Sequence, residues 1–389
     1  MKLGEICSFL NGGTPSKEVA KYFEGDIPWI TGADILGPVV NSARSHITEE
    51  AISASATNRV PTRTVLLVTR TSVGKVAISG VELCYSQDIT ALKPNLDQLN
   101  IDYLVHFLRS QESYLKSQSR GATIKGITKS VLQNLDIPLP PIATQKHIAA
   151  ILDQAEELRS KRRSAIALLD ELGRSVFLEM FGDPYIHGWP IESINEILNG
   201  TNGAIRTGPF GSQLLHSEFT DQGIAVLGID NAVANEFRWG ERRFISELKY
   251  QELKRYTVKP GDVIITIMGT CGRCAIVPDN IPISINTKHV CCITLDLEKC
   301  LPRFLHAYFL IHPIAKKYLE QTMKGAIMSG LNMGIIRAMP IPRPPLALQQ
   351  QFAERMEAIE TLKATHRQSL AKLDTLFASL QHRAFRGEL

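Results

Sequence analysis

The feature that most constrains this chain is an internal duplication. Residues 137–181 align without a gap to residues 341–385, and sixteen of the 45 aligned positions are identical. The identical pairs include Gln145 with Gln349 and Asp170 with Asp374, at an offset of 204. A repeat of this length and identity indicates one structural element that is used twice in the same fold.

Each copy predicts one long helix that begins after a run of prolines. Proline favours extended backbone before the helix and pre-sets its first turn, and no later proline interrupts either copy. Apolar residues then recur at alternating spacings of four and three, which is typical of a coiled-coil seam. About 40 residues at a rise of 1.5 Å give a helix of roughly 60 Å, so we expect the two helices to pair as an antiparallel coiled coil. The predicted seam consists of Ile148, Leu152, Ala155, Ile166, Leu169, Val176, Phe352, Met356, Ile359, Leu370, Leu373, Phe377 and Leu380.

The predicted seam is polar at its centre in both copies. Arg159 and Arg162 in the first copy match Lys363 and His366 in the second. Such a stretch is typical of a solvated or register-setting part of a coiled coil. The alternative is that Arg159, Lys161, Arg162 and Arg163 contact DNA or a partner subunit.

A segment of about 140 to 155 residues precedes each predicted helix. The two segments resemble each other weakly: residues 65–78 match residues 263–276, with Gly74 over Gly272 and Lys75 over Arg273. Both mix β-branched runs with shorter helical patterns, so we expect an α/β (α+β) fold with two globular domains that contain mixed sheets. The predicted division is residues 1–140, a helix over 141–184, residues 185–340 and a helix over 341–389, related by a pseudo-twofold repeat.

Composition narrows the class of protein. The net charge of +4 permits a polyanionic partner. Seven cysteines form an odd set over a long chain, and no apolar stretch approaches ~18 residues, so we expect a cytoplasmic protein without a membrane span. Gly74-Lys75 is followed by valine rather than by the hydroxyl residue of a phosphate loop. We therefore expect no ATP hydrolysis by this chain. No serine, histidine and aspartate set has a spacing that indicates nucleophilic catalysis, so no catalytic residue is predicted.

A cysteine-rich stretch offers one alternative site. Cys271 and Cys274 have zinc-ligand spacing, but the aligned positions in the first segment are Val73 and Val76, which favours buried packing on a strand. We therefore predict no metal site, with a zinc-dependent enzyme as a rival hypothesis that metal analysis would detect. The further sulfur and imidazole groups of this stretch are His289, Cys291, Cys292 and Cys300.

Glycine-rich polar loops and basic residues are the candidates for contact with a nucleic acid. Residues 11–16 and 206–213 each follow an expected first strand, and glycine lets backbone N–H groups approach phosphates closely. Arginine and glutamine can read base edges, although a solvated surface charge is the alternative at each position. The candidates are Thr14, Ser16, Arg70, Thr71, Lys75, Arg120, Thr123, Lys125, Arg206, Ser212, Gln213, Arg273, Lys288, His289 and Lys324.

The whole arrangement resembles the specificity subunits of prokaryotic type I restriction-modification systems. The resemblance rests on two dissimilar segments that are each followed by a near-copy of one helix, on Phe-Gly-Asp-Pro at 181–184, and on Ala-Phe-Arg-Gly-Glu-Leu at 384–389. It implies a non-catalytic DNA-binding subunit whose two globular domains each read one half of an asymmetric, bipartite target. The helix pair would act as a ruler between them.

The resemblance also implies partners. Two methyltransferase subunits would bring S-adenosylmethionine and flip the target adenine, and two restriction subunits would bring ATP and Mg²⁺, so that this chain holds no cofactor of its own. The polar centre of the seam leaves the effective length of the ruler open. The alternative function is a coiled-coil scaffold that binds proteins and reads no DNA sequence.

Overall fold

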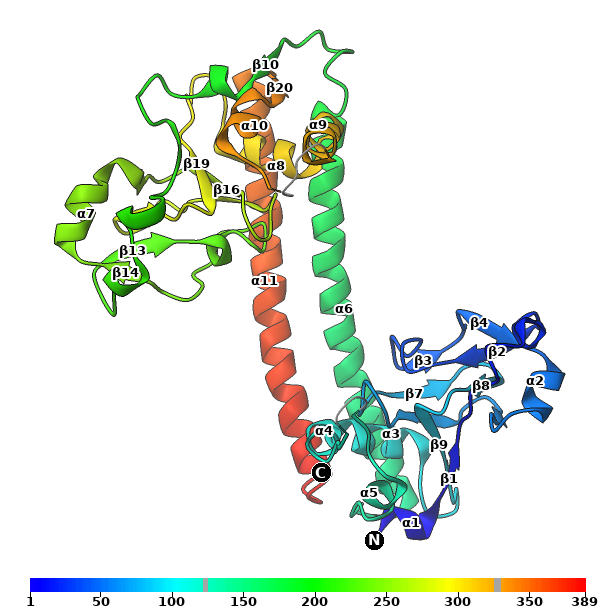
Figure 1. Cartoon of the computed structure of the whole chain (residues 1–389). Coiled ribbons are helices and arrows are strands. Elements are labelled where there is room, and N and C mark those ends of the chain that lie inside the picture. The colour runs from blue at the N-terminus through cyan, green and yellow to red at the C-terminus, as the bar shows by residue number, and fades with distance from the viewer. Residues whose placement is uncertain (122–124, 325–329) are drawn as a thin grey trace. The chain divides into compact units, whose positions relative to one another are not determined.

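The computed structural model describes residues 1–121, 125–324 and 330–389, apart from the side chains at 323 and 324. The chain divides into two compact units (Figure 1). Unit 1 contains Met1–Ser164 and Arg367–Leu389, and unit 2 contains Ala165–His366. Each unit therefore joins a globular part to one half of each long helix, so that these units cut across the predicted domain boundaries.

The long helices lie where the duplication predicts them. Helix α6 spans Ile142–Phe181 and helix α11 spans Leu346–Ala384. Both begin directly after the proline runs, because the prolines hold the preceding backbone extended. None of the helices in the described part of the chain is long and apolar enough to cross a membrane.

Unit 1 contains two mixed sheets, which confirms the predicted fold class. One sheet has the order β1-β9-β6-β7-β3 and the other β4-β2-β8-β5, with β2 and β8 parallel. The strands are β1 (Cys7–Asn11), β2 (Ile27–Ile30), β3 (Val39–Val40), β4 (Ser45–Ile47), β5 (Arg59–Val60), β6 (Val65–Val68), β7 (Val76–Ser79), β8 (Leu83–Tyr85) and β9 (Ile89–Pro94). The short helices are α1 (Leu3–Ile6), α2 (Glu49–Ser53), α3 (Ile101–Ser110), α4 (Glu112–Ser117) and α5 (Lys129–Gln133).

Unit 2 repeats this strand order with different loops. The order β11-β19-β16-β17 matches β1-β9-β6-β7, and β14-β13-β18-β15 matches β4-β2-β8-β5, again with one parallel pair, β13 with β18. The strands are β10 (Ile191–Ser193), β11 (Ile205–Thr207), β12 (Phe219–Thr220), β13 (Ile224–Leu227), β14 (Phe244–Ile245), β15 (Thr257–Val258), β16 (Val263–Thr266), β17 (Cys274–Ile276), β18 (Ser284–Asn286), β19 (Val290–Ile293) and β20 (Pro340–Pro342). The short helices are α7 (Glu247–Leu253), α8 (Pro302–Ile311), α9 (Pro313–Lys324) and α10 (Met333–Ala338).

Each unit buries one face of its first sheet against a helix and the long helix pair. In unit 1, α3 packs Tyr103 and Phe107 against Phe385, with ring centroids 5.3 and 5.4 Å apart. In unit 2 the corresponding core is built around Phe177 and Phe352, whose centroids are 5.4 Å apart. Burial of these aromatic rings supplies much of the apolar area that holds the helices to the sheets.

A buried glutamine fixes α6 to the globular part of unit 1. Gln145 has no exposed surface. Its Oε1 accepts a hydrogen bond from the Asn100 N–H at 2.9 Å, and its Nε2 donates to the carbonyl oxygens of Gln98 and Pro140, both at 2.8 Å. One side chain therefore ties together the start of α3, the proline run and the first turn of α6.

The duplicated glutamine does the same in unit 2. Gln349 is also fully buried, and its Oε1 accepts from the Leu301 N–H at 2.9 Å. Its Nε2 donates to the carbonyl oxygens of Lys299 at 3.1 Å and Pro344 at 2.9 Å. The repeat therefore has glutamine at both positions because each side chain makes the same three hydrogen bonds.

The two long helices are antiparallel in each unit: residue numbers rise along α6 in the direction in which they fall along α11. All the predicted seam residues are buried or half-buried. In unit 1 the polar centre is an ion-pair set: Arg159 Nε lies 2.7 Å from Asp374 Oδ1, and Nη1 contacts Glu156. The Arg159 guanidinium also stacks 4.3 Å from the centroid of the Phe377 ring.

The same set recurs in unit 2 at the repeat positions. Lys363 Nζ lies 2.7 Å from both Asp170 Oδ1 and Glu360 Oε1. Burial opposes the charge of Lys363, but these hydrogen bonds outweigh it and raise its pKa. Charged residues at seam positions with fixed partners specify register, so the ion pairs favour the register-setting interpretation for Lys363 and favour it over a DNA contact for Arg159.

Position 173 of α6 differs in size from its repeat equivalent in α11. Phe377 in unit 1 corresponds to Gly173 in unit 2, and a cavity of about 120 Å³ lies there. A Cβ on Gly173 would come within 3.0 Å of Met356 Cε.

Candidate nucleic-acid interface

A three-residue connector links the two sheets in each unit. Residues 86–88 join β8 to β9, and residues 287–289 join β18 to β19. The glycine-rich loops pack against these connectors: Gly12 N donates to Ile89 O and Gly208 N donates to Thr287 O, both at 3.2 Å. A Cβ on Gly12 would lie 2.2 Å from Ser86 O, and one on Gly208 would lie 1.9 Å from Asn286 O, so glycine is required at both places.

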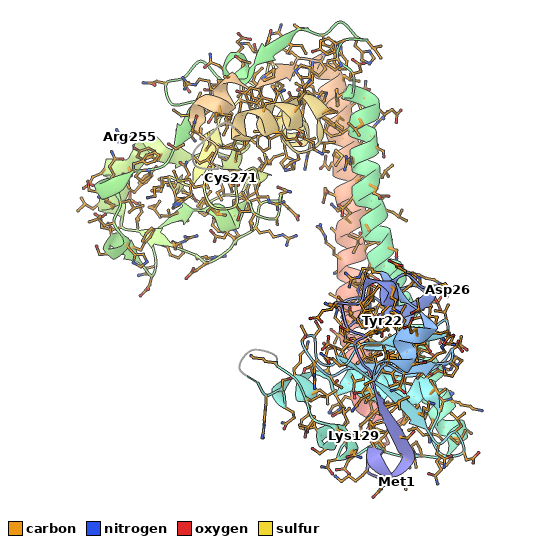
Figure 2. The ribbon with its side chains drawn as sticks, turned by 45° about the vertical axis from the view of Figure 1, so that its right-hand side comes forward. Met1, Tyr22, Asp26, Lys129, Arg255 and Cys271 are labelled. Carbon is orange, nitrogen blue, oxygen red and sulfur yellow. The ribbon has the colours of Figure 1, made fainter. Side chains whose placement is uncertain are left out.

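The connector of unit 1 borders a polar cleft of about 300 Å³. Arg70 and Lys129 are exposed cations at this cleft, and none of the described residues that line it is acidic. Lys129 begins α5 (Figure 2), with Nζ 6.0 Å from the centroid of the Phe9 ring. The complete lining is Asn11, Gly12, Thr69, Arg70, Gln87, Thr90, Ile127, Thr128, Lys129 and Leu132.

The turn between β6 and β7 carries three of the predicted residues. Arg70 and Thr71 are exposed, and the backbone of Gly126 bridges to Arg70 and to Arg120. Thr71 N donates to Lys125 O at 2.9 Å, so residues from two distant segments meet at this turn. Lys75 is half-buried, and its Nζ donates to Ile35 O at 3.3 Å.

The remaining unit 1 candidates lie elsewhere. Thr14 is half-buried and Ser16 is exposed in the segment that follows the glycine-rich loop, and neither lines the cleft. Ser16 Oγ accepts a hydrogen bond from Glu18 N at 3.4 Å. Thr123 lies outside the described residues.

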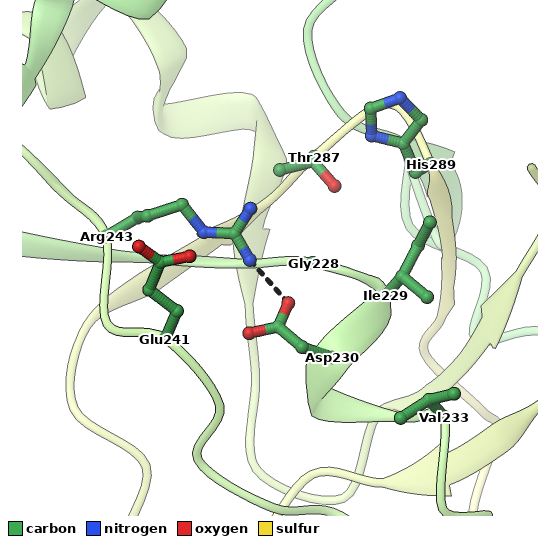
Figure 3. Close-up of a pocket in the computed structure, with 8 residues that line it drawn as sticks. All are labelled: Gly228, Ile229, Asp230, Val233, Glu241, Arg243, Thr287 and His289. Carbon is green, nitrogen blue, oxygen red and sulfur yellow. Dashed lines mark hydrogen bonds and ion pairs between the residues drawn. The ribbon is translucent and has the colours of Figure 1, made fainter. Parts of the chain in front are cut away.

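Unit 2 carries a larger cleft of about 480 Å³ beside its own connector (Figure 3). Asp230 forms an ion pair with Arg243, and the two side chains are 31% and 35% exposed. Thr287 and His289 come from the connector and complete the polar part of the lining together with Glu241. The other lining residues are Gly228, Ile229 and Val233.

The surroundings of His289 favour the neutral form of its imidazole. Burial lowers the pKa of its imidazole below the ordinary value, and the positive charges of Lys288 and Arg243 lower it further. A neutral imidazole has one donor and one acceptor, so it can read either kind of base-edge group. Lys288 is half-buried in the same connector.

The prediction for Arg206 requires a correction. Its side chain is 8% exposed, and Nη2 lies 2.6 Å from Asp262 Oδ2. The guanidinium also donates to Gly203 O, Thr294 Oγ1 and Thr257 O. Because these donors are consumed inside unit 2 and the charge is compensated there, Arg206 holds strands together rather than facing a ligand.

Other unit 2 candidates are not gathered at the cleft. Ser212 and Gln213 are exposed in a single turn, where Gln213 Oε1 accepts from Phe210 N at 3.3 Å and from the Tyr256 hydroxyl at 2.9 Å. Arg273 is exposed at the β16–β17 turn. The side chain of Lys324 lies outside the described part of the structure.

The cysteine-rich stretch is packed in the core. Cys274, Cys291, Cys292 and Cys300 are buried, and burial raises the pKa of the Cys291 thiol to about 12. Cys271 is half-buried at the turn between β16 and β17 (Figure 2). Among the described residues, no group of three or more histidine, cysteine or acidic side chains could hold a metal ion.

Sequence reasoning missed several lining residues. Gln87 in unit 1 and Asp230, Glu241 and Arg243 in unit 2 carry no local pattern, since they meet only when loops from different strands converge. The connectors share one pattern in the sequence, because each follows a short apolar strand at the equivalent place of the two segments. The predicted candidates include Lys288 and His289 from the second connector and no residue from the first.

Comparisons with known proteins agree with the duplicated architecture. A family model described as the type I restriction modification DNA specificity domain matches residues 1–167 and 214–375. The specificity subunit of the type I restriction enzyme MjaVIII from Methanocaldococcus jannaschii is 23% identical over 407 residues, which cover 100% of this chain and 92% of that protein. The EcoR124I/EcoR124II specificity subunit of Escherichia coli is 34% identical over 163 residues, 40% of each chain.

Two solved structures share the fold. The S subunit of a type I restriction-modification system from M. genitalium superposes with a TM-score of 0.59 at 16% identity, covering 99% of this chain and 95% of that one. A chain from structural work on complex assembly and conformational transition of the type I R-M system has a TM-score of 0.60 at 18% identity, with 100% and 97% coverage.

Proposed function

This chain belongs to the family of type I restriction-modification DNA specificity domains, and we propose that it directs its complex to a split, asymmetric DNA target. Unit 1 reads one half of that target and unit 2 reads the other. The single observation that carries the proposal is the repetition of one strand order in two units, each with its own cleft beside the connector and a different lining.

The shared frame supports a shared task. The same connector and the same closely packed glycine occur in both units. The clefts meet this shared frame at different places, because residues 11–12, 69–70 and 127–132 line the first and residues 228–243 line the second. Backbone packing of this precision is expected where loops must hold side chains at fixed positions.

The differing linings support two different half-sites. The unit 1 cleft offers Asn11, Gln87 and Arg70, whose amide and guanidinium groups pair with adenine and guanine edges in the major groove. The unit 2 cleft offers the ion pair of Asp230 with Arg243 and the imidazole of His289. These donor and acceptor sets are unlike, so we expect the two units to read different sequences.

A duplicated apolar surface supports two copies of one partner. Leu158 and Leu362 are repeat equivalents with 49% and 52% exposure, and Leu172 and Leu376 are equivalents with 48% and 49%. Each unit holds one residue of each pair, so the same exposed leucines occur twice. Large apolar side chains left exposed at repeated places suit docking of two identical subunits.

The partners in this proposal are two methyltransferase subunits and two restriction subunits. The former supply S-adenosylmethionine and the latter supply ATP and Mg²⁺, while this chain contributes recognition without catalysis. Helices α6 and α11 serve as the spacer that sets the distance between half-sites.

The test is a base-modification map of DNA from a methylation-free host that co-expresses this chain with its methyltransferase subunit. We expect N6-methyladenine on one split motif whose two halves differ, and no such signal when this chain is omitted. The scaffold alternative predicts a stoichiometric complex that modifies no defined motif, and that result would overturn the proposal.

A further inference from the structure

Thr71 holds an unusual backbone conformation. Its φ is +64°, in the left-handed region that a β-branched residue rarely adopts. The equivalent position in unit 2 is Gly269, with φ of +69°. The turn between the two strands therefore needs a left-handed residue, and unit 2 supplies the one that adopts this conformation without strain.

The two turns have the same backbone hydrogen bonds. In unit 1, Val68 N donates to Lys75 O at 2.9 Å and Gly74 N donates to Val68 O at 3.0 Å. In unit 2, Thr266 N donates to Arg273 O and Gly272 N donates to Thr266 O, both at 2.9 Å. Since glycine forms the same turn, nothing in the backbone of unit 1 requires a threonine.

Two other non-glycine residues in the described chain have a positive φ, and both use their side chains inside the fold. Arg63 Nη2 donates to both carboxylate oxygens of Asp102 at 3.0 Å, and Asn235 Oδ1 accepts from Cys274 N at 3.2 Å. The Thr71 side chain is exposed, and its hydroxyl has no hydrogen-bond partner among the described residues. A strained residue whose side chain makes no hydrogen bond inside the fold is typical of a functional position.

The surroundings of Thr71 suit DNA. Arg70 lies next to it at the cleft, and Arg120 is joined to the same turn through Gly126, so exposed cations flank the threonine. The Thr71 N–H is already bonded to Lys125 O, which leaves the side chain as the group that can contact a ligand.

We propose that Thr71 is a specificity-determining residue of unit 1, whose exposed hydroxyl, held out by the left-handed turn, contacts a base edge in the first half-site. This inference rests on the proposed function. Arg120 contacts a phosphate and helps to position the turn, whereas the threonine, beside Arg70, discriminates between bases.

The experiment measures competition binding by the complex of the full chain with its methyltransferase subunits. The probes are duplexes that carry the motif modified by the wild-type complex and each single-base variant of it. We expect Thr71→Gly to lose about tenfold of discrimination at one base position in one half-site, as loss of a single hydrogen bond would give. Its melting temperature should be unchanged or higher, because the strain is relieved.

Three further variants separate the effect of the hydroxyl from the effect of the backbone strain. Thr71→Val keeps the strain without the hydroxyl and should lose the same discrimination, while Thr71→Ser should retain it. Arg63→Gly relieves the backbone strain of another left-handed residue in the same unit, away from the cleft. This variant should leave recognition of the DNA target unchanged. An equal loss of affinity for every probe would assign Thr71 to a phosphate and overturn the inference.

The failure of this inference is distinguishable from that of the proposed function. A wild-type complex without sequence preference would overturn both. A selective wild-type complex together with a fully selective Thr71→Gly variant, or a destabilised Thr71→Gly unit 1, would overturn the inference alone.

Discussion

Replacement of either buried glutamine by methionine should loosen one unit and leave the other intact. Gln145→Met keeps the length of the side chain but removes one acceptor and two donors from a site without exposed surface. The Asn100 N–H and the carbonyl oxygens of Gln98 and Pro140 are then left without their partner.

The size of the effect follows from the hydrogen bonds. Each contributes about 1 kcal/mol net, and a buried group left without a partner costs about 1–3 kcal/mol. Burial of the apolar methionine offsets part of this, so we expect the free energy of unfolding to fall by about 2–3 kcal/mol. Gln349→Met should cost the same, because its three contacts are equivalent.

The assay must resolve the two units, since a chain with two compact units need not unfold in one step. Urea denaturation combined with hydrogen–deuterium exchange gives a local free energy for residues 98–104 in unit 1 and 299–305 in unit 2. Gln145→Met should weaken protection in the first segment, and Gln349→Met in the second.

Gln350→Met is the matched control. Gln350 is exposed beside Gln349, and its Nε2 donates to the carboxylate of Glu354 at 3.2 Å, so its replacement should change stability by less than about 0.5 kcal/mol. A loss below about 1 kcal/mol for Gln145→Met, or equal loosening of both units, would refute this account of how the helices are anchored.

Three further outcomes are expected. Gly12→Ala should destabilise unit 1 by at least about 2 kcal/mol in urea denaturation, because the added Cβ meets a connector carbonyl oxygen at 2.2 Å. Gly173→Ala should raise the free energy of unfolding by about 0.5–1 kcal/mol, because alanine favours the helix and the Met356 tip can shift into the adjacent cavity. The charge of Asp34 should add about 2 kcal/mol to the free energy of unfolding at neutral pH, measured against Asp34→Asn. This contribution should be lost as the pH falls from about 4 to 2.

The pH prediction follows from the contacts of Asp34. Burial opposes its charged form, but hydrogen bonds from Arg44 and Thr31 outweigh that effect and lower the carboxyl pKa to about 2. A folded-state pKa below that of the unfolded chain means that stability is full above the unfolded value and declines toward the folded one. A difference between wild type and Asp34→Asn that stays constant from pH 7 to pH 2 would contradict it.

The other two predictions have clear opposite outcomes. If Gly12→Ala unfolds at the wild-type urea concentration, the connector does not confine the glycine-rich loop. If Gly173→Ala lowers the free energy of unfolding, the Met356 side chain does not shift into the cavity to make room for the added methyl group.

The duplication predicted the helices well because helical periodicity is local. The seam positions could be read from the spacing of apolar residues, and the proline runs marked where each helix begins. The ion-pair sets around Arg159 and Lys363 could not be read, since their partners Asp374 and Asp170 lie more than 190 residues away in the sequence. The two ion-pair sets are repeat equivalents of each other, which becomes visible only when the structure identifies the partners.

The candidate site was harder to predict because it depends on loops that converge. Arg70 and His289, two of the candidates for DNA contact, line clefts beside the connectors, whereas Arg206, which looked equally suitable beside its glycine loop, is buried. Its burial depends on Asp262, which is 56 residues away. No sequence pattern distinguishes an arginine that meets a buried carboxylate from one that faces solvent.

The central claim is that each unit reads its own half of the target. The most direct measurement is the modification map of two matched connector variants, Gln87→Ala in unit 1 and Lys288→Ala in unit 2, each in complex with the methyltransferase subunit. The account predicts that each variant relaxes or alters one half of the split motif, a different half for each, and leaves the other half intact. A change in both halves from either variant, or the same half altered by both, would contradict it.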